Sequence, residues 1–106
     1  MSLKHIDLDN YEEEVENSDV PVVIDFYADW CGPCKMMSPI FEATGEEYGG
    51  KVKFVKLDVQ SNEGLAAKFG VQGIPTLVIL KDGEEKGRIT GMTTQDALKQ
   101  KIDSLI

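Results

Sequence analysis

The stretch from Val20 to Ala28 is the feature that most restricts what this 106-residue chain can fold into, because it is nearly continuously apolar. A strand covered by helices on both faces has this pattern, whereas a strand with one face in water alternates. Pro21 stands at its start, where a strand tolerates a missing N–H. The stretch therefore predicts a strand buried on both faces, interrupted by one carboxylate, Asp25.

The rest of the chain alternates between strand and helix patterns joined by short loops. Asp9 or Asn10 can cap a first helix, Ser61 a third and Thr93 a last one. Asp82-Gly83 is a hairpin signal. We expect further strands at 3–8, 51–59, 76–80 and 84–90, and helices at 10–17, 31–48, 61–70 and from 93 onward. This order predicts one domain over residues 1–106, an α/β fold with a central mixed sheet, mostly parallel with a C-terminal antiparallel hairpin, flanked by four helices.

The sequence Trp30-Cys31-Gly32-Pro33-Cys34 follows the buried strand and holds both cysteines of the chain. Two cysteines three residues apart on a helix lie within the distance that a disulfide requires. Pro33 suits the first helical turn, and Gly32 adds no side chain that would shield Cys31. At the N-cap, unpaired backbone donors and the helix dipole favour the thiolate of Cys31. We therefore expect Cys31 to be the nucleophile, and Cys34, which should be more shielded, to be the resolving thiol.

Charge and composition narrow the class of partner and the compartment. The 11 basic and 19 acidic residues give a net charge of −8, which argues against nucleic acid or an anionic membrane surface. The first seven residues have no apolar signal core, and the longest apolar runs are too short to span a bilayer. With both cysteines in one motif, none remains as a structural staple, which fits a reducing cytosol. We expect a cytoplasmic protein.

A metal site is a weaker interpretation of the two cysteines. Zinc prefers four ligands, and His5, the only histidine, stands alone near the start of the chain. The chain also lacks a glycine-rich dinucleotide fingerprint. We therefore expect no metal and no cofactor other than the redox-active cysteine pair, and electrons must come from a partner protein.

Several motifs in order extend over nearly the whole chain, and with them the sequence closely resembles the thioredoxin family. The matching segments are Asp25-Phe26, Trp30-Cys31-Gly32-Pro33-Cys34-Lys35, Pro39, Gly73-Ile74-Pro75-Thr76 and Gly91. A Cys-X-X-Cys alone is a weak signal, but this ordered set is a strong one. The chain departs from the family at Tyr27, where many members have tryptophan.

The resemblance implies further site residues. It implies that Pro75 is cis and lies beside the disulfide, although from the residues alone Pro75 reads as a strand-entry residue. It implies that Ile74 offers backbone hydrogen bonds to an extended substrate segment, and that Lys56 lies close to Asp25. The apolar docking surface that it implies consists of Trp30, Gly32, Pro33, Gly73, Ile74 and Gly91.

The leading functional hypothesis is a thiol-disulfide oxidoreductase that reduces disulfide-containing target proteins and is re-reduced by a thioredoxin reductase, acting as a monomer. Asp25 would accept the proton of Cys34, directly or through water, because burial should raise the pKa of this carboxyl group. An exposed Asp25 is the alternative, but alternation would then expose Val23 and Tyr27 as well. A binding module that uses the Trp30 and Pro75 surface without redox turnover is the alternative function. Net oxidation or isomerisation in an exported compartment is disfavoured.

Overall fold

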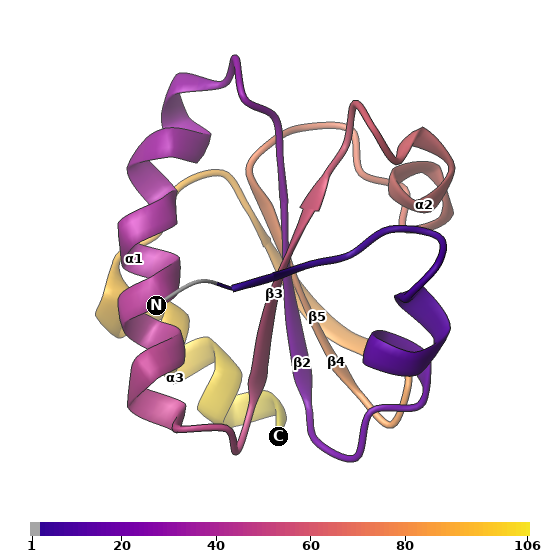
Figure 1. The fold of residues 1–106 in the computed structure, drawn as a ribbon. Helices are drawn as coiled ribbons and strands as arrows, with labels where there is room; N and C mark the ends of the chain where they lie inside the picture. The colour runs from indigo at the N-terminus through magenta and orange to yellow at the C-terminus, as the bar shows by residue number, and fades with distance from the viewer. Residues whose placement is uncertain (1–2) are drawn as a thin grey trace.

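The computed structural model describes residues 3–106, so the first two residues of the expected domain lie outside the described part (Figure 1). The elements are, in chain order, β1 (Lys4–His5), η1 (Glu12–Glu16), β2 (Val22–Tyr27), α1 (Gly32–Tyr48), β3 (Lys53–Asp58), α2 (Glu63–Lys68), β4 (Thr76–Lys81), β5 (Glu84–Thr90) and α3 (Gln95–Leu105). Among residues 3–106, no helix combines the length and the apolar composition needed to cross a membrane.

The described strands form a five-stranded mixed sheet in the order β1-β3-β2-β4-β5. β3 pairs in parallel with β1 and β2, whereas β4 runs antiparallel to both β2 and β5. The α/β class, the mixed sheet and the C-terminal hairpin are confirmed, but parallel pairings are only half of the total, so "mostly parallel" overstates them. β4 runs antiparallel to β2, which is itself parallel to β3, so β4 starts at the end of the sheet where β3 finishes.

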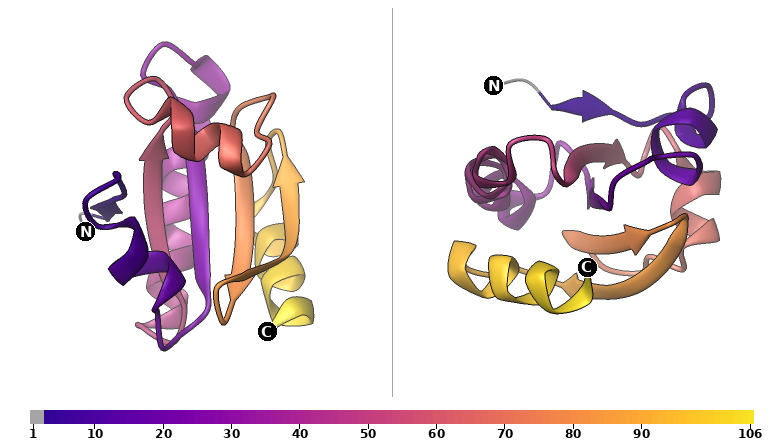
Figure 2. Two further views of the ribbon diagram at one scale, coloured as in Figure 1. Left: turned by 90° about the vertical axis from the view of Figure 1, so that its right-hand side faces the viewer. Right: turned by 90° about the horizontal axis from the view of Figure 1, so that it is seen from below.

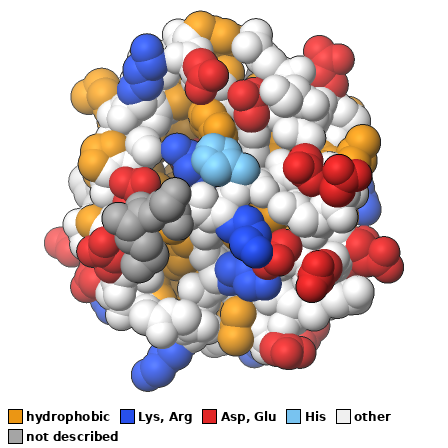
Figure 3. Space-filling view, in the orientation of Figure 1, with side chains coloured by type: hydrophobic (Ala, Val, Ile, Leu, Met, Phe, Trp, Pro, Cys, Tyr) orange, Lys and Arg blue, Asp and Glu red, His pale blue; other side chains and the backbone are white. Residues whose placement is uncertain are grey.

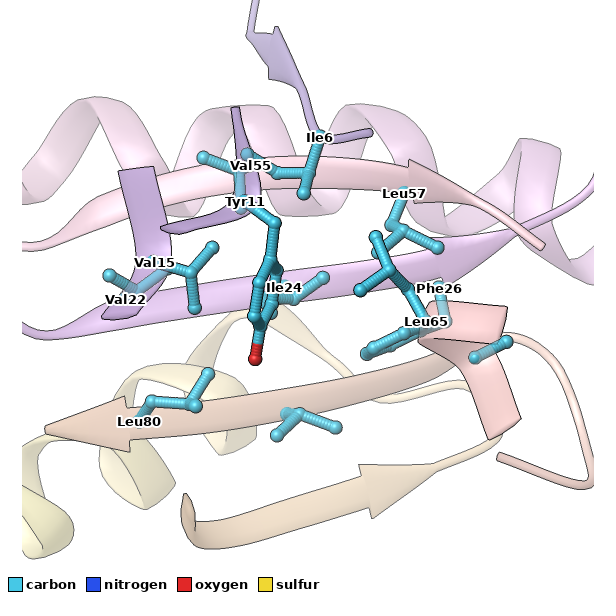
Figure 4. Close-up of a cluster of buried hydrophobic side chains, with 12 residues drawn as sticks. Ile6, Tyr11, Val15, Val22, Ile24, Phe26, Val55, Leu57, Leu65 and Leu80 are labelled. Atoms are coloured by element: carbon cyan, nitrogen blue, oxygen red, sulfur yellow. The ribbon is translucent and has the colours of Figure 1, made fainter. Parts of the chain in front are cut away.

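Helices cover both faces of the sheet, with α1 and α3 on one side and η1 and α2 on the other (Figures 1 and 2). Val22, Ile24 and Phe26 of β2 pack in the core on the η1 and α2 face, shown in Figure 4. Val23 packs in the core on the α1 and α3 face. The expected strand buried on both faces is thus β2, and alternation places Asp25 on the face of Val23.

Three helix starts differ from the expected positions. α2 follows Asn62 rather than Ser61, and the N-cap of α3 is Thr94 rather than Thr93. The first helix is a short π-helical segment, in which the Asn17 N–H donates to the Glu12 carbonyl at 2.9 Å. The Asp7 carboxylate accepts the backbone N–H groups of Asp9 and Asn10, and the Asn10 side-chain oxygen accepts the Asp7 N–H. Neither Asp9 nor Asn10 therefore caps this segment, which has no side-chain cap. Adjacent polar residues can each cap a helix, and the sequence alone does not show which of them is the N-cap.

The cap of α3 gives a direct stability prediction. The Thr94 hydroxyl accepts the Ala97 N–H at 3.1 Å. Thr94→Ala removes this acceptor and should lower the free energy of unfolding by about 1 kcal/mol. Thr93→Ala is the matched control and should change it by less than about 0.5 kcal/mol. Urea melts of both variants measure the difference, and equal losses would show that the cap is not the stabilising feature.

Candidate active site

The junction between β2 and α1 places the two cysteines at the end of the sheet where β2 finishes, at the top of Figure 1. Cys31 is the N-cap of α1 and has an extended backbone, and Pro33 lies in the first helical turn. The Cα atoms of Cys31 and Cys34 are 5.2 Å apart, and their sulfurs form a disulfide. The expected helix start and the expected disulfide are both confirmed.

The helix N-terminus acts directly on the sulfur of Cys31. The Cys34 N–H donates to Cys31 Sγ at 3.2 Å. In the reduced protein the same donor would face the Cys31 thiolate, which the positive end of the helix dipole also favours. The expected difference in shielding is absent in this disulfide form, because Cys31 is 4% exposed and Cys34 3% exposed. Bonding at the N-cap, rather than burial, distinguishes the two sulfurs.

The loop before β4 lies against the disulfide. The Ile74–Pro75 peptide bond is cis, as the resemblance implied. Cys31 Sγ is 3.9 Å from the carbonyl oxygen of Ile74, and Ile74 packs against the small cluster that contains both cysteines. Pro75 is buried, and its carbonyl oxygen accepts the Gly91 N–H at 2.8 Å. This hydrogen bond joins two loops that are distant in the sequence.

Apolar side chains are exposed around the cysteines. Trp30 is 66% exposed, while the expected docking residues Gly32, Pro33 and Gly73 are exposed and Ile74 and Gly91 are half-buried. Met36 and Met92 are exposed too, and they stand two residues after Cys34 and directly after Gly91. Sequence reasoning missed both, although methionine next to a functional motif is typical of adaptable binding surfaces. Exposed large apolar side chains beside a reactive site indicate that another protein docks there.

Asp25 is fully buried, at 0% exposure, and neither carboxylate oxygen has a hydrogen-bond partner among the described residues. Burial raises the pKa of this carboxyl group from 3.8 to about 6, and the positive charge of Lys56 opposes part of the rise. Lys56 on β3 is the register partner of Asp25 on β2, so the expected proximity of the two residues is confirmed. A buried carboxyl group that titrates near neutral pH can exchange a proton during a reaction.

Lys56 lies at the edge of a cavity beside Cys34. The Lys56 Nζ donates to the Ser38 hydroxyl at 3.1 Å and lies 4.5 Å from the centroid of the Tyr27 ring. The cavity has a volume of about 120 Å³, which is large enough for water. Its lining consists of Tyr27, Ala28, Asp29, Cys34, Lys35, Ser38 and Lys56. Sequence reasoning missed Ser38, which no motif or spacing indicates.

The only histidine contacts Tyr27. His5 Nδ1 is 3.2 Å from the Tyr27 hydroxyl oxygen. Among the described residues, no group of three or more His, Cys, Asp and Glu side chains could hold a metal ion.

Comparisons with known proteins cover nearly the whole chain. The family model described as Thioredoxin matches residues 2–104. A protein named thioredoxin from Porphyra purpurea is 39% identical over 106 residues, which are 100% of this chain and 99% of the relative. A thioredoxin from Allochromatium vinosum is 39% identical over 97% of this chain and 96% of its own length. A thioredoxin from Haemophilus influenzae is 48% identical over 76% of this chain and 75% of its own length.

Proposed function

The chain belongs to the thioredoxin family, and from that membership we propose how its residues divide the work of reduction between them. The protein is a thiol-disulfide oxidoreductase, and its redox group is its own Cys31–Cys34 pair. In our proposal Cys31 is the nucleophile and Cys34 the resolving thiol. The observation that carries this assignment is the Cys34 N–H donated to Cys31 Sγ at the start of α1.

The reaction consists of two exchanges. The Cys31 thiolate attacks one sulfur of a target disulfide, forms a mixed disulfide and expels the first target thiolate. Cys34 then loses its proton and attacks Cys31 Sγ, which breaks the mixed disulfide and releases the second target thiolate. Two electrons pass to the target, whose disulfide is reduced, and the Cys31–Cys34 disulfide forms. Gly32 and Pro33 support both steps, since Gly32 adds no side chain over Cys31 and Pro33 fits the first helical turn.

Asp25 is the proposed proton acceptor for Cys34 in the second exchange. Its buried carboxyl group has a pKa of about 6, so near neutral pH it is mostly ionised and can take a proton. Cys34 and Lys56, the register partner of Asp25, both line a cavity large enough for water. Lys56 tunes the step, because its positive charge keeps the pKa of Asp25 from rising further.

The target segment is proposed to dock on the apolar surface around Cys31. Trp30 supplies exposed area, and Ile74 supplies backbone groups next to the reactive sulfur. Pro75 and Gly91 stabilise this surface through the hydrogen bond that joins their loops. Gly73 adds no side chain to it and leaves the backbone open to an extended segment.

Disulfide-containing proteins and a thioredoxin reductase are the partners that the family implies in general. We propose that such a reductase re-reduces this chain directly, in the cytoplasm, with the chain acting as a monomer. The presence of both cysteines in the redox motif supports a reducing compartment. The net charge of −8 argues against nucleic acid or an anionic membrane as a further partner. Sedimentation of the oxidised and reduced proteins tests the monomer, and a stable dimer would contradict it.

Replacing both cysteines with serine tests reduction against the alternative of binding without turnover. With dithiothreitol as electron donor and insulin as the disulfide probe, the wild-type protein should accelerate reduction and the double variant should not. If the chain only binds partners without redox turnover, neither form would accelerate the reduction of insulin. Circular dichroism of the double variant serves as the control for folding.

A further inference from the structure

Tyr27 occupies a position next to the proposed proton pathway that the function above does not explain. In the sheet, His5 on β1 and Asp25 on β2 are both register partners of Lys56 on β3. Tyr27 is two residues beyond Asp25 on the same strand, so both side chains lie on the same face of the sheet. One face therefore brings together a carboxyl group, a lysine, a histidine and an aromatic ring from three adjacent strands.

The Tyr27 side chain extends across β3 toward β1. Its ring centroid is 4.5 Å from the Lys56 Nζ, within the range of a cation–π interaction. Its hydroxyl oxygen is 3.2 Å from His5 Nδ1, and the two rings meet edge to face with centroids 6.1 Å apart. The Tyr27 side chain thus has two contacts: its ring face lies against Lys56, and its hydroxyl group lies against His5.

We propose that Tyr27 is a positioning residue for the resolving step, and that its ring holds the Lys56 ammonium group close to Asp25. Contact with His5 orients the ring for this purpose. The proposal deepens the proposed function, and it rests on Asp25 being the proton acceptor for Cys34. The departure from the tryptophan of many family members is then conservative in effect, because both side chains present an aromatic face to the lysine.

The Lys56 side chain is flexible, so its ammonium group needs contacts that keep it near Asp25. A lysine at the edge of a cavity can extend its flexible side chain into solvent, where water and salt screen its charge. The face of Tyr27 and the hydroxyl of Ser38 together hold the ammonium group at the cavity instead. Its positive charge then acts on a carboxyl group that has no hydrogen bond of its own among the described residues.

Other charged or titratable groups surround this pathway. They are Lys35 on α1, Asp29 after β2, Asp58 at the end of β3 and His5 on β1. Burial, followed by the charges of Asp58, Asp29 and Asp25, raises the pKa of the Tyr27 hydroxyl group. Tyr27 therefore stays neutral, and its ring acts on Lys56 without a charge. The histidine, pale blue in Figure 3, is surface-exposed and accessible to substitution.

The titration of Asp25 in the oxidised protein tests the proposal without any turnover. Carbon-13 NMR of the Asp25 carboxyl group should give a midpoint about one pH unit higher in Tyr27→Leu than in wild type, because the loosened lysine stabilises the carboxylate less. Tyr27→Phe keeps the ring and should restore most of the wild-type midpoint. Lys56→Met should raise the midpoint at least as much as Tyr27→Leu.

The double variant decides whether Tyr27 acts through Lys56. In the Lys56→Met background, Tyr27→Leu should leave the midpoint nearly unchanged. An unchanged midpoint in Tyr27→Leu alone, or an equal shift in both backgrounds, would overturn the proposal. Circular dichroism of Tyr27→Leu shows whether this variant folds, so that a shift can be assigned to loss of the ring.

Kinetics separate this inference from the proposed function of Asp25. The pH at which the resolving step reaches half its maximal rate should rise in Tyr27→Leu along with the Asp25 midpoint. If the midpoint shifts but the rate profile does not, Tyr27 still positions Lys56, but Asp25 is not the proton acceptor. If neither shifts, Tyr27 has no positioning role.

Discussion

Cys34→Ser should accumulate covalent mixed disulfides through Cys31, whereas Cys31→Ser should accumulate few. The first exchange needs only a reactive thiolate, and the second needs the resolving thiol that Cys34→Ser lacks. The mixed disulfide of this variant is therefore not resolved rapidly, and it accumulates. The opposite variant keeps only the thiol that lies one turn inside α1.

The size of the difference follows from thiolate fractions. A cysteine with an ordinary pKa of about 8.5 is only about 3% thiolate at pH 7, whereas one with its pKa lowered below 7 by a helix N-terminus is more than half thiolate. The Cys34 N–H donated to Cys31 Sγ favours the thiolate of Cys31 rather than that of Cys34. We therefore expect trapping through Cys31 to exceed trapping through Cys34 about twentyfold.

Insulin is a suitable disulfide probe for this experiment. Non-reducing electrophoresis and mass spectrometry of each variant after incubation at pH 7 count the trapped complexes and identify the cysteine that is joined. The double serine variant is the control and should trap none. Since both cysteines are almost equally buried, equal trapping by the two single variants would show that the N-cap does not determine which one attacks.

Local features of the active site could be predicted from the sequence because neighbouring residues determine them. Pro33 and Gly32 mark the start of α1, and that start determines the position of Cys31 at the N-cap. The burial of Asp25 could be predicted in the same way, because apolar residues flank it on both sides in the strand. In each case a single element suffices for the inference.

Features that depend on two or more elements could not be predicted from the residues alone, although the family resemblance implied that Lys56 lies near Asp25 and that Pro75 lies beside the disulfide. α2 has only six residues, whereas the sequence suggests a longer helix at 61–70, and β4 runs antiparallel to its neighbour β2. The contact between Tyr27 and His5 joins residues 22 positions apart, and Ser38 reaches Lys56 from a different layer of the fold. No periodicity or motif encodes such side-chain meetings, which arise only when helix and sheet pack together.

Asp25→Ala should make the protein more stable at neutral pH and slower in reduction. The folded-state pKa of about 6 lies above the ordinary value of 3.8, so the unfolded chain ionises first as pH rises. Below the unfolded pKa the carboxyl group is protonated in both the folded and the unfolded state, so its ionisation does not change the free energy of unfolding. Stability is then lost as pH climbs through the window up to the folded pKa, at about 1.4 kcal/mol per unit, or about 3 kcal/mol in all.

The alanine variant lacks this titration and keeps the stability that wild type loses. Removing the carboxyl group leaves a small cavity, which costs less than about 1 kcal/mol. The net gain in the free energy of unfolding at pH 7 should therefore be about 2 kcal/mol, and it should disappear below about pH 4. Urea melts across this range measure the difference. Asp29→Ala, which removes an exposed carboxylate, is the matched control and should change stability by less than about 0.5 kcal/mol.

The kinetic effect of the same substitution should appear only in the second exchange. Without Asp25 to accept its proton, Cys34 attacks the mixed disulfide more slowly, by tenfold to a hundredfold as an order-of-magnitude expectation. Trp30, the only tryptophan, stands next to Cys31 and is exposed, so its fluorescence in stopped-flow experiments can follow both exchanges. The loss should shrink below about pH 6, where wild-type Asp25 is itself protonated and cannot accept the proton. A variant that is less stable at pH 7 and reduces insulin at the wild-type rate would show that Asp25 has only a structural role.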